Sequence, residues 1–139
     1  MGRKPRKTTA RVCRVLLVDD DPDIRSVFVD VFSAEGYCVQ AVEDAFAALH
    51  ALRRRARPDV VILDLLLPRM DGWTFLSLLR ADPKLKGTRV LVLSAVAHAR
   101  RSELESADAV AAKPADLATL CAILRDLCHP HAAKVAAYG

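Results

Sequence analysis

The sequence predicts an α/β domain built on a doubly wound, five-stranded parallel sheet. Short apolar runs of strand length recur along the chain, and they alternate with segments in which apolar residues repeat at helical spacing. Strands that are buried on both faces and alternate with amphipathic helices favour parallel pairing with right-handed crossovers. A chain of 139 residues is long enough for one such domain with a single substantial core.

Continuous apolar runs identify the expected strands. Each run has four residues, and the second is interrupted by Gln40. Runs of this length between turn-forming residues are typical of buried strands. The expected strands are 15–18, 39–42, 60–63, 90–93 and 109–112.

Helical spacing of apolar residues predicts the helices that follow these strands. The first apolar series begins at Ile24 and stops before Gly36, a residue suited to a left-handed C-terminal cap, and Asp21 is the expected N-cap. The arginines from Arg53 onward suit the C-terminus of the second helix, and Pro83 stops the third. The expected helical segments are 24–32, 45–52, 75–79, 97–107 and 117–128.

The positive charge of the chain is concentrated at its N-terminus. The formal net charge is +4, yet residues 1–14 hold six cations and no acid, which leaves the remainder slightly acidic. We therefore expect a basic flexible tail over 1–11, one domain over 12–128 and a C-terminal tail over 129–139. DNA binding is not expected, apart from contacts that the basic tail could make. No apolar run reaches the roughly 18 residues of a membrane span, and no secretory signal is visible, so we expect a cytoplasmic protein.

The cysteines give no sign of a metal site or a disulfide framework. Cys13, Cys38, Cys121 and Cys128 include no C-x-x-C pair and have no histidine at zinc-finger spacing. A free cysteine usually behaves as a small buried hydrophobic residue. The sequence therefore predicts four buried thiols.

Carboxylate, hydroxyl and ammonium side chains follow the expected strands. Asp19 and Asp20 come after the first strand, Asp64 after the third, Ser94 after the fourth and Lys113 after the fifth. The carboxyl ends of parallel strands meet at one edge of the sheet, so these groups should converge. Clustered carboxylates repel one another unless a hard cation such as Mg²⁺ joins them, and one carboxylate can then attack a phosphoryl group. Lys113 and Ser94 would contact the phosphoryl oxygens.

Four motifs surround these residues: "VLLVDDDPDIR" from Val15, "VVILDLLLPRMDG" from Val60, "LVLSA" from Leu91 and "AAKP" from Ala111. With them, residues 12–128 resemble the receiver domain of a two-component response regulator, of the stand-alone, chemotaxis-regulator-like kind. The resemblance implies a flavodoxin-like sheet of order 2-1-3-4-5 with five helices.

The resemblance also implies a role for each matching residue. Asp64 would be the phosphoacceptor, and Mg²⁺ (or Mn²⁺) would bind Asp19, Asp20 and the backbone carbonyl of Leu66. Ser94 would be the switch hydroxyl and Lys113 the phosphate-binding lysine. The supporting positions are Pro68, Asp71 and Gly72, which shape the loop after the third strand, and Pro114, whose peptide bond is typically cis in the family.

The implied partners are proteins of a phosphorelay. The phosphodonor would be a phosphohistidine on a sensor histidine kinase or a phosphotransfer protein, and signalling would act through altered binding of an unknown downstream protein. The chain would not be a conventional enzyme, although it would catalyse its own phosphorylation. The alternative is a receiver-shaped interaction module that works independently of phosphorylation.

Several positions depart from the family pattern. Only 19 positions separate Ser94 from Lys113, so the fourth helix or its flanking loop should be short. Val110 occupies the position of a frequent aromatic switch residue, and Ala115 that of a frequent phenylalanine. Leu66 and Val96, two residues beyond Asp64 and Ser94, are apolar where the family's side chains influence water access, and they predict slow autodephosphorylation.

A second enzyme class shares part of this pattern. Asp19-x-Asp21 after an apolar strand, followed by Ser94 and Lys113, resembles the motifs of haloacid-dehalogenase-type phosphatases. That class also needs an acidic pair after the lysine, which the sequence lacks, and it gives Asp64 no role.

Overall fold

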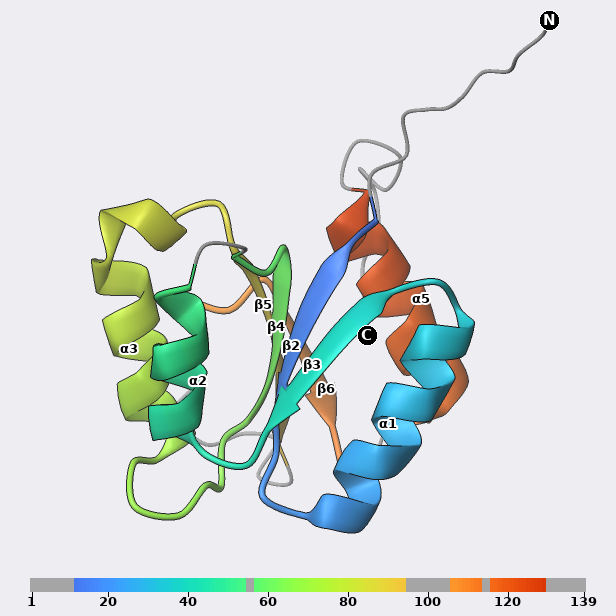
Figure 1. Cartoon of the computed structure of the whole chain (residues 1–139), viewed down its shortest axis with the longest axis horizontal. Helices are drawn as coiled ribbons and strands as arrows, with labels where there is room; N and C mark the ends of the chain where they lie inside the picture. Colours follow the sequence, from blue (N-terminus) through green and yellow to red (C-terminus); the bar gives the residue numbers. More distant parts are fainter. Residues whose placement is uncertain (1–11, 55–56, 95–105, 114–115, 130–139) are drawn as a thin grey trace, which may run out of the picture.

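A computed structural model describes residues 12–54, 57–94, 106–113 and 116–129. Five parallel strands form one sheet in the order β3-β2-β4-β5-β6, which is the order 2-1-3-4-5 along the chain and confirms the prediction. Figure 1 shows this sheet at the centre of the molecule. The strands are β2 (Arg14–Val18), β3 (Cys38–Val42), β4 (Val60–Asp64), β5 (Arg89–Ser94) and β6 (Ala109–Ala112).

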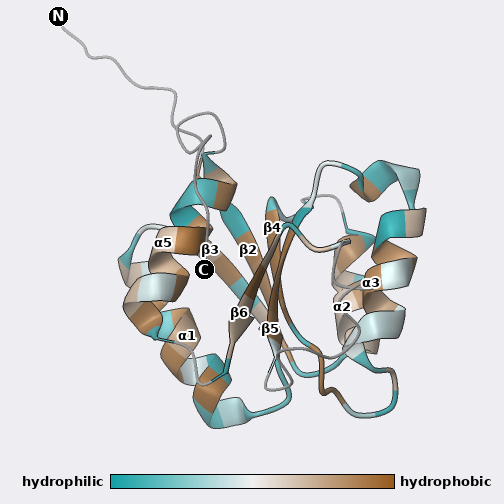
Figure 2. Ribbon diagram, turned by 180° about the vertical axis from the view of Figure 1, so that it is seen from behind, coloured by the Kyte–Doolittle hydropathy of each residue, from teal (hydrophilic) through white to brown (hydrophobic). Residues whose placement is uncertain are grey.

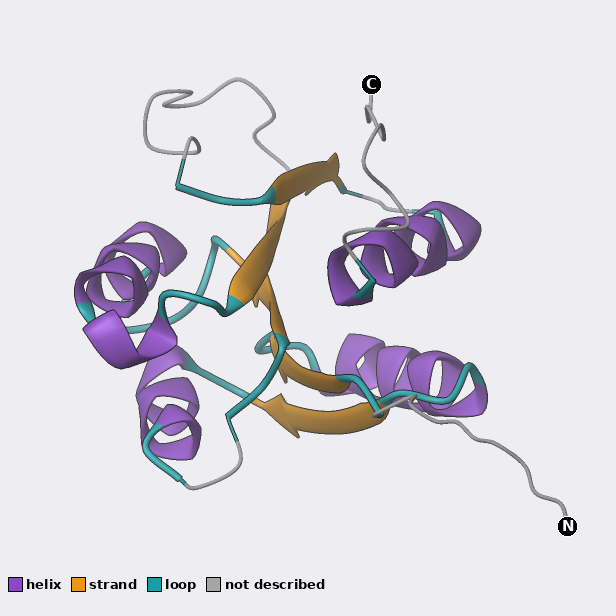
Figure 3. Ribbon diagram, turned by 90° about the horizontal axis from the view of Figure 1, so that it is seen from above, coloured by secondary structure: helices purple, strands orange, loops and turns teal. Residues whose placement is uncertain are grey.

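Helices cover both faces of the sheet, as Figure 3 shows from above. α2 and α3 lie on one face, and α1 and α5 lie on the other. The segment expected to form the fourth helix, 97–107, lies almost wholly outside the described residues. The described helices are α1 (Pro22–Ala34), α2 (Ala45–Leu52), α3 (Gly72–Ala81), α5 (Leu117–Cys128) and the short 3-10 helix η1 (Pro83–Leu85).

The side-chain alternation of the strands divides the interior into two cores. In β4, Val61 and Leu63 pack with α2 and α3, whereas Val60 and Ile62 pack with α1 and α5. β4 and β5 are mostly hydrophobic along their length (Figure 2). The prediction that all strands are buried on both faces holds for β4 and β5 and for most of β2. It is wrong for β3 and β6, which are partly exposed because each lies at an edge of the sheet.

The predicted residues that begin and end the helices are confirmed, although α1 and α3 extend beyond the expected segments 24–32 and 75–79. The carboxylate of Asp21 accepts hydrogen bonds from the N–H groups of Asp23 and Ile24 and caps α1. Gly36 follows that helix with φ of 100°, a left-handed conformation that glycine adopts without strain. α3 ends at Ala81, directly before Asp82 and Pro83.

The prediction of four buried thiols is wrong. Cys13 and Cys128 form a disulfide across 115 positions, with their Cα atoms 6.0 Å apart, and Cys38 is exposed. The bond joins the residue before β2 to the last turn of α5. Sequence spacing could not reveal this pair, because the two cysteines become neighbours only when α5 packs beside the sheet.

The residues that the structure describes include no helix long and apolar enough to cross a membrane.

Candidate functional site

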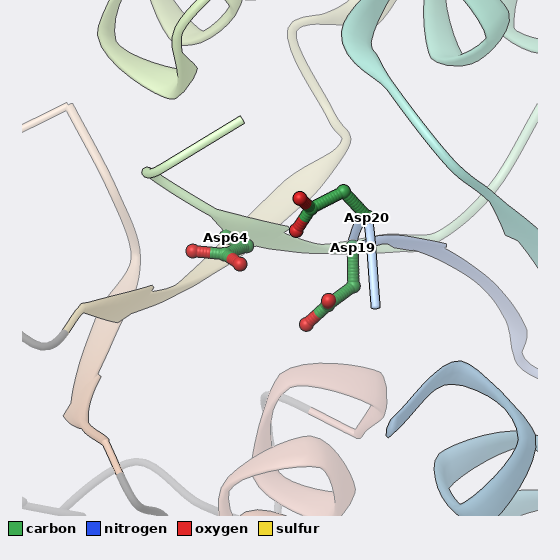
Figure 4. Close-up of side chains that lie close together, drawn as sticks. All are labelled: Asp19, Asp20 and Asp64. Carbon is green, nitrogen blue, oxygen red and sulfur yellow. The ribbon is translucent and has the colours of Figure 1, made fainter. Parts of the chain in front are cut away.

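Three carboxylates gather at the carboxyl end of the sheet. Asp19 and Asp20 directly follow β2, and Asp64 is the last residue of β4, the strand beside it. Figure 4 shows their side chains together at these adjoining strand ends. One oxygen from each carboxylate lies within 4.8 Å of the others. The convergence predicted from the strand ends is therefore present.

Asp64 is held by one contact to each oxygen. The residue is 3% exposed, its Oδ1 accepts a hydrogen bond from the N–H of Leu66 at 3.0 Å, and its Oδ2 lies 3.0 Å from Nζ of Lys113. The backbone contact fixes the carboxylate at the start of the β4–α3 loop. The ammonium compensates part of the negative charge that the strand carries to this edge.

Asp19 is the most deeply buried member of the cluster, with 1% of its surface exposed. Its Oδ1 accepts a hydrogen bond from the N–H of Asp21 at 2.9 Å. Its Oδ2 is buried and has no hydrogen bond within the described part of the chain, and Nζ of Lys113 lies 4.0 Å away. Burial raises the pKa of Asp19 above its ordinary value, and the nearby charge of Asp64 raises it further, against the lowering effects of the Asp21 N–H and Lys113.

This donor set fits a hard divalent cation. Among the described residues, the cluster holds three carboxylates against one ammonium and the guanidinium of Arg25, so it carries excess negative charge in a partly buried place. The oxygen of Asp19 that lacks a hydrogen bond is the position where a cation would remove the largest electrostatic cost. Oxygen ligands of this kind suit Mg²⁺.

Ser94 and Lys113 reach the same edge from the neighbouring strands. Ser94 ends β5 and is 2% exposed, and Lys113 follows β6. The N–H of Lys113 donates to the carbonyl of Ser94 at 2.9 Å, so one backbone hydrogen bond joins the two positions. Leu93 pairs with Asp64 in the sheet register, which places Ser94 one residue beyond the level of the carboxylate.

The loop after Asp64 is shaped by the three residues expected to support it. The carbonyl of Pro68 accepts a hydrogen bond from Met70 N–H at 2.8 Å, and the carboxylate of Asp71 accepts one from Thr74 N–H and caps α3. A Cβ on Gly72 would lie 2.6 Å from Cα of Leu65 and 2.9 Å from the carbonyl oxygen of Asp64. Only glycine lets α3 begin this close to the end of β4.

Arg69, which the sequence analysis did not single out, joins the same loop to α2. Arg69 has φ of 67° and forms an ion pair with Asp44, the N-cap of α2, while its guanidinium lies 5.4 Å from the ring centre of Phe46. Arg25 also reaches the site and donates to the carbonyl of Asp19 at 2.9 Å. No sequence pattern pairs these residues, since the contacts depend on how α1 and α2 are placed beside the loop.

Two of the remaining predicted positions lie within the described residues. Val110 is 36% exposed on β6, and Leu66 is 62% exposed in the β4–α3 loop. Val96, Pro114 and Ala115 lie outside the described residues.

Comparison with known proteins connects this geometry to one family. A sequence model of the response regulator receiver domain matches residues 15–125. The chain is 40% identical over 82 residues to the DNA-binding response regulator MtrA of Mycolicibacterium smegmatis, an alignment that covers 59% of this chain and 34% of MtrA. It is 33% identical over 129 residues to the DNA-binding dual master transcriptional regulator RpaA of Synechocystis, covering 87% of this chain and 53% of RpaA. The chain thus spans about a third of the length of MtrA and about half of the length of RpaA.

Solved structures give the same result for the fold. The response regulator TrrA from Thermotoga maritima, crystallised in complex with Mg²⁺ and BeF, has a TM-score of 0.75 and 28% sequence identity. The match covers 84% of this chain and 99% of that structure.

Proposed function

The chain belongs to the response regulator receiver domain family, and from this membership we propose that it accepts a phosphoryl group on Asp64. The donor is a phosphohistidine on a sensor histidine kinase or a phosphotransfer protein. One observation carries the proposal: Asp64 is buried between the N–H of Leu66 and the ammonium of Lys113, beside two further carboxylates.

The transfer is a phosphoryl displacement. An oxygen of Asp64 forms the new P–O bond, the P–N bond to the donor histidine breaks, and its electron pair stays on the imidazole, which takes up a proton. Lys113 would stabilise the negative charge that moves onto the phosphoryl oxygens during the transfer, since its Nζ already lies 3.0 Å from Oδ2 of Asp64. Ser94, at the end of the next strand, supplies a hydroxyl at the same edge.

Mg²⁺ (or Mn²⁺) is the proposed cofactor, held by Asp19, Asp20 and the carbonyl of Leu66. When bound, the ion neutralises charge on the phosphoryl oxygens. Asp19 suits this role because its buried Oδ2 has no hydrogen bond within the described residues, and Leu66 suits it because the hydrogen bond from its N–H to Oδ1 of Asp64 holds the residue beside that carboxylate. TrrA, which has a similar fold, was solved in complex with Mg²⁺ and BeF, and this supports Mg²⁺ as the cofactor.

Phosphorylation would change partner binding by charge. It adds about two negative charges at Asp64, and these attract Ser94 and Lys113 differently in the two conformations of a switching domain. The downstream partner is a protein. MtrA and RpaA are named as DNA-binding proteins, and DNA binding is not part of the function proposed for this chain. Leu66, which is exposed and apolar, together with Val96, supports slow autodephosphorylation.

The alternative function is an interaction module that does not need phosphorylation. It is favoured by Val110, where the family often has an aromatic switch residue, and by the short connection between Ser94 and Lys113. Under this alternative the acidic cluster would bind Mg²⁺ without accepting phosphate.

Incubation with acetyl phosphate and Mg²⁺ tests the proposal. Mass spectrometry should detect one added phosphoryl group on the wild type and none on Asp64→Asn. Asp21→Asn is the matched control, since asparagine caps α1 as well as aspartate does, and it should be phosphorylated like the wild type. An unmodified wild type would favour the interaction module. A phosphoryl group that depends on Asp21 and not on Asp64 would instead support phosphatase-type chemistry.

A further inference from the structure

A groove lies between the C-terminal ends of α2 and α3, away from the acidic site. Helices run antiparallel to the strands in this fold, so these helix ends lie at the amino end of the sheet, opposite Asp19 and Asp64 (Figure 1). The groove encloses about 400 Å³, within the range of ligand-binding cavities. It is lined by Leu49, Leu52, Arg53, Arg57, Leu78, Asp82, Lys84 and Leu85.

The floor of the groove is apolar. Leu52 and Leu85 are each 4% exposed and belong to the core beneath α2 and α3. Leu78 is 45% exposed on the rim, although it lies on a helix whose other leucines, Leu76 and Leu79, are buried. The groove is therefore an open apolar site, which large aliphatic side chains of a ligand could occupy.

The rim of the groove is cationic. The side chains of Arg53, Arg57 and Lys84 are exposed and form no ion pair within the described part of the chain. The single acid of the lining, Asp82, already accepts a hydrogen bond from Lys84 N–H at 2.9 Å and caps η1. Three cations without an ion pair among the described residues, placed around an apolar floor, are complementary to a ligand that is both acidic and apolar.

We propose that this groove binds an acidic amphipathic helix of a partner protein, with leucine-type side chains on the floor and carboxylates facing Arg53, Arg57 and Lys84. The terminal segments of this chain do not have that chemistry. Residues 1–11 hold five cations and no acid, and residues 130–139 hold one lysine and no acid. A nucleic acid would match the cations but would leave the leucine floor without a partner. The binding site is separate from Asp64 and does not depend on phosphorylation.

Fluorescence anisotropy with a defined probe tests the proposal. The probe is a labelled helical peptide of leucine and glutamate only, with leucine at i, i+3, i+4 and i+7, and it should bind the wild type with micromolar affinity. Arg57→Glu with Lys84→Glu should weaken binding about tenfold through charge reversal. Leu78→Ser, at a position that is 45% exposed, should weaken it about fivefold through lost apolar contact. The matched control, Arg54→Glu with Lys86→Glu, reverses two exposed cations outside the groove and should change affinity less than about twofold.

Two control ligands and an NMR measurement distinguish binding in this groove from non-specific electrostatic attraction. A peptide of the same composition in scrambled order, and a labelled single-stranded oligonucleotide, should both bind at least about tenfold more weakly than the amphipathic peptide. NMR amide shifts on peptide addition should cluster at Leu49, Leu78 and Leu85. The proposal is overturned by no binding of the amphipathic peptide, by equal binding of either control ligand, or by shifts that cluster elsewhere.

Discussion

At the amino end of the sheet, Oδ2 of Asp108 accepts hydrogen bonds from Val90 N–H and from the guanidinium of Arg80, both at 2.7 Å. At the carboxyl end, Oδ2 of Asp19 is buried, has no hydrogen bond within the described residues, and lies 4.0 Å from the nearest ammonium. Both carboxylates lie at ends of the same sheet. Oδ2 of Asp108 accepts two hydrogen bonds, whereas the buried Oδ2 of Asp19 accepts none from the described residues.

The two ends of the sheet have different roles: the contacts at the amino end stabilise the fold, and the acidic cluster at the carboxyl end provides the candidate site. The amino end also carries the Cys13–Cys128 disulfide and Asp59, whose side chain accepts from Arg14 N–H at 2.9 Å. Its charged groups fasten strands and helices to one another. The carboxyl end concentrates Asp19, Asp20 and Asp64 around one lysine, which costs stability but creates a place for a cation and a phosphoryl group. Removing a charge from the buried part of the acidic cluster and removing a charge at the amino end should therefore change stability in opposite directions.

The largest expected effect comes from the disulfide. Cys13→Ala with Cys128→Ala should lower the free energy of unfolding by about 4 kcal/mol, because the bond closes a long loop and so restricts the unfolded chain. Urea denaturation of oxidised and dithiothreitol-treated wild type should show the same loss as the double variant. Cys38→Ala is the control, and its exposed thiol should contribute less than about 0.5 kcal/mol. Equal urea midpoints with and without the reductant would show that the amino end does not depend on this bond.

The second effect concerns Asp108. Asp108→Ala should cost about 2 kcal/mol, because it leaves the buried N–H of Val90 without its acceptor and removes the anion beside Arg80. Asp108→Asn keeps an acceptor oxygen and should cost about half as much. Phosphorylation by acetyl phosphate should proceed in both variants, since the change lies at the opposite end of the sheet. A loss of phosphorylation in a folded Asp108 variant would mean that the two ends are coupled.

Sequence reasoning was strong where a function follows from the position of a residue along a strand. Asp19, Asp64, Ser94 and Lys113 could be placed together because parallel strands end at one edge, and the structure places all four there. The glycine of the loop was also identified, although its physical reason, the close approach of α3 to β4, needed coordinates.

Contacts between distant elements could not be predicted in this way. The Cys13–Cys128 bond, the pairing of Arg69 with Asp44 and the bond from Arg80 to Asp108 each join residues whose side chains meet only after helices pack beside the sheet. Edge exposure of β3 and β6 was missed for a similar reason, since an apolar run does not show whether a strand has one neighbour or two.

A smaller effect of opposite sign is expected at Asp19. Asp19→Asn should raise the free energy of unfolding by about 1 kcal/mol at neutral pH without added metal, because it removes a buried charge that burial and Asp64 disfavour. Asp20→Asn is the matched control at the exposed neighbour and should change stability by less than about 0.5 kcal/mol. Urea denaturation of the three proteins measures both. A destabilised Asp19→Asn would show that the carboxylate contributes to the fold and is not held there at a cost.

The smallest effect is expected at Asp44, which lies at the same end of the sheet as Asp19 but has a hydrogen bond and an ion pair to its carboxylate. The pKa of Asp44 is held below its ordinary value of 3.8, chiefly by the hydrogen bond from Ala47 N–H and further by Arg69. A lowered pKa in the folded state means that the ionised form stabilises the fold above pH 3.8, and that this contribution is lost as the pH falls through the folded pKa. Asp44→Asn retains the N-cap but loses the charge, so at pH 7 it should cost only about 0.5 kcal/mol, since Arg69 is largely exposed.

The urea midpoints of wild type and Asp44→Asn should therefore converge as the pH is lowered below 3.8. Arg69→Gln completes a double-mutant cycle, and its coupling to Asp44→Asn should vanish over the same pH range. A difference that persists in acid would assign the effect of Asp44 to the helix cap and not to its charge. Convergence would instead show that the ionised carboxylate of Asp44 stabilises the fold through Arg69, in contrast to the ionised carboxylate of Asp19, for which the Asp19→Asn variant tests the opposite effect.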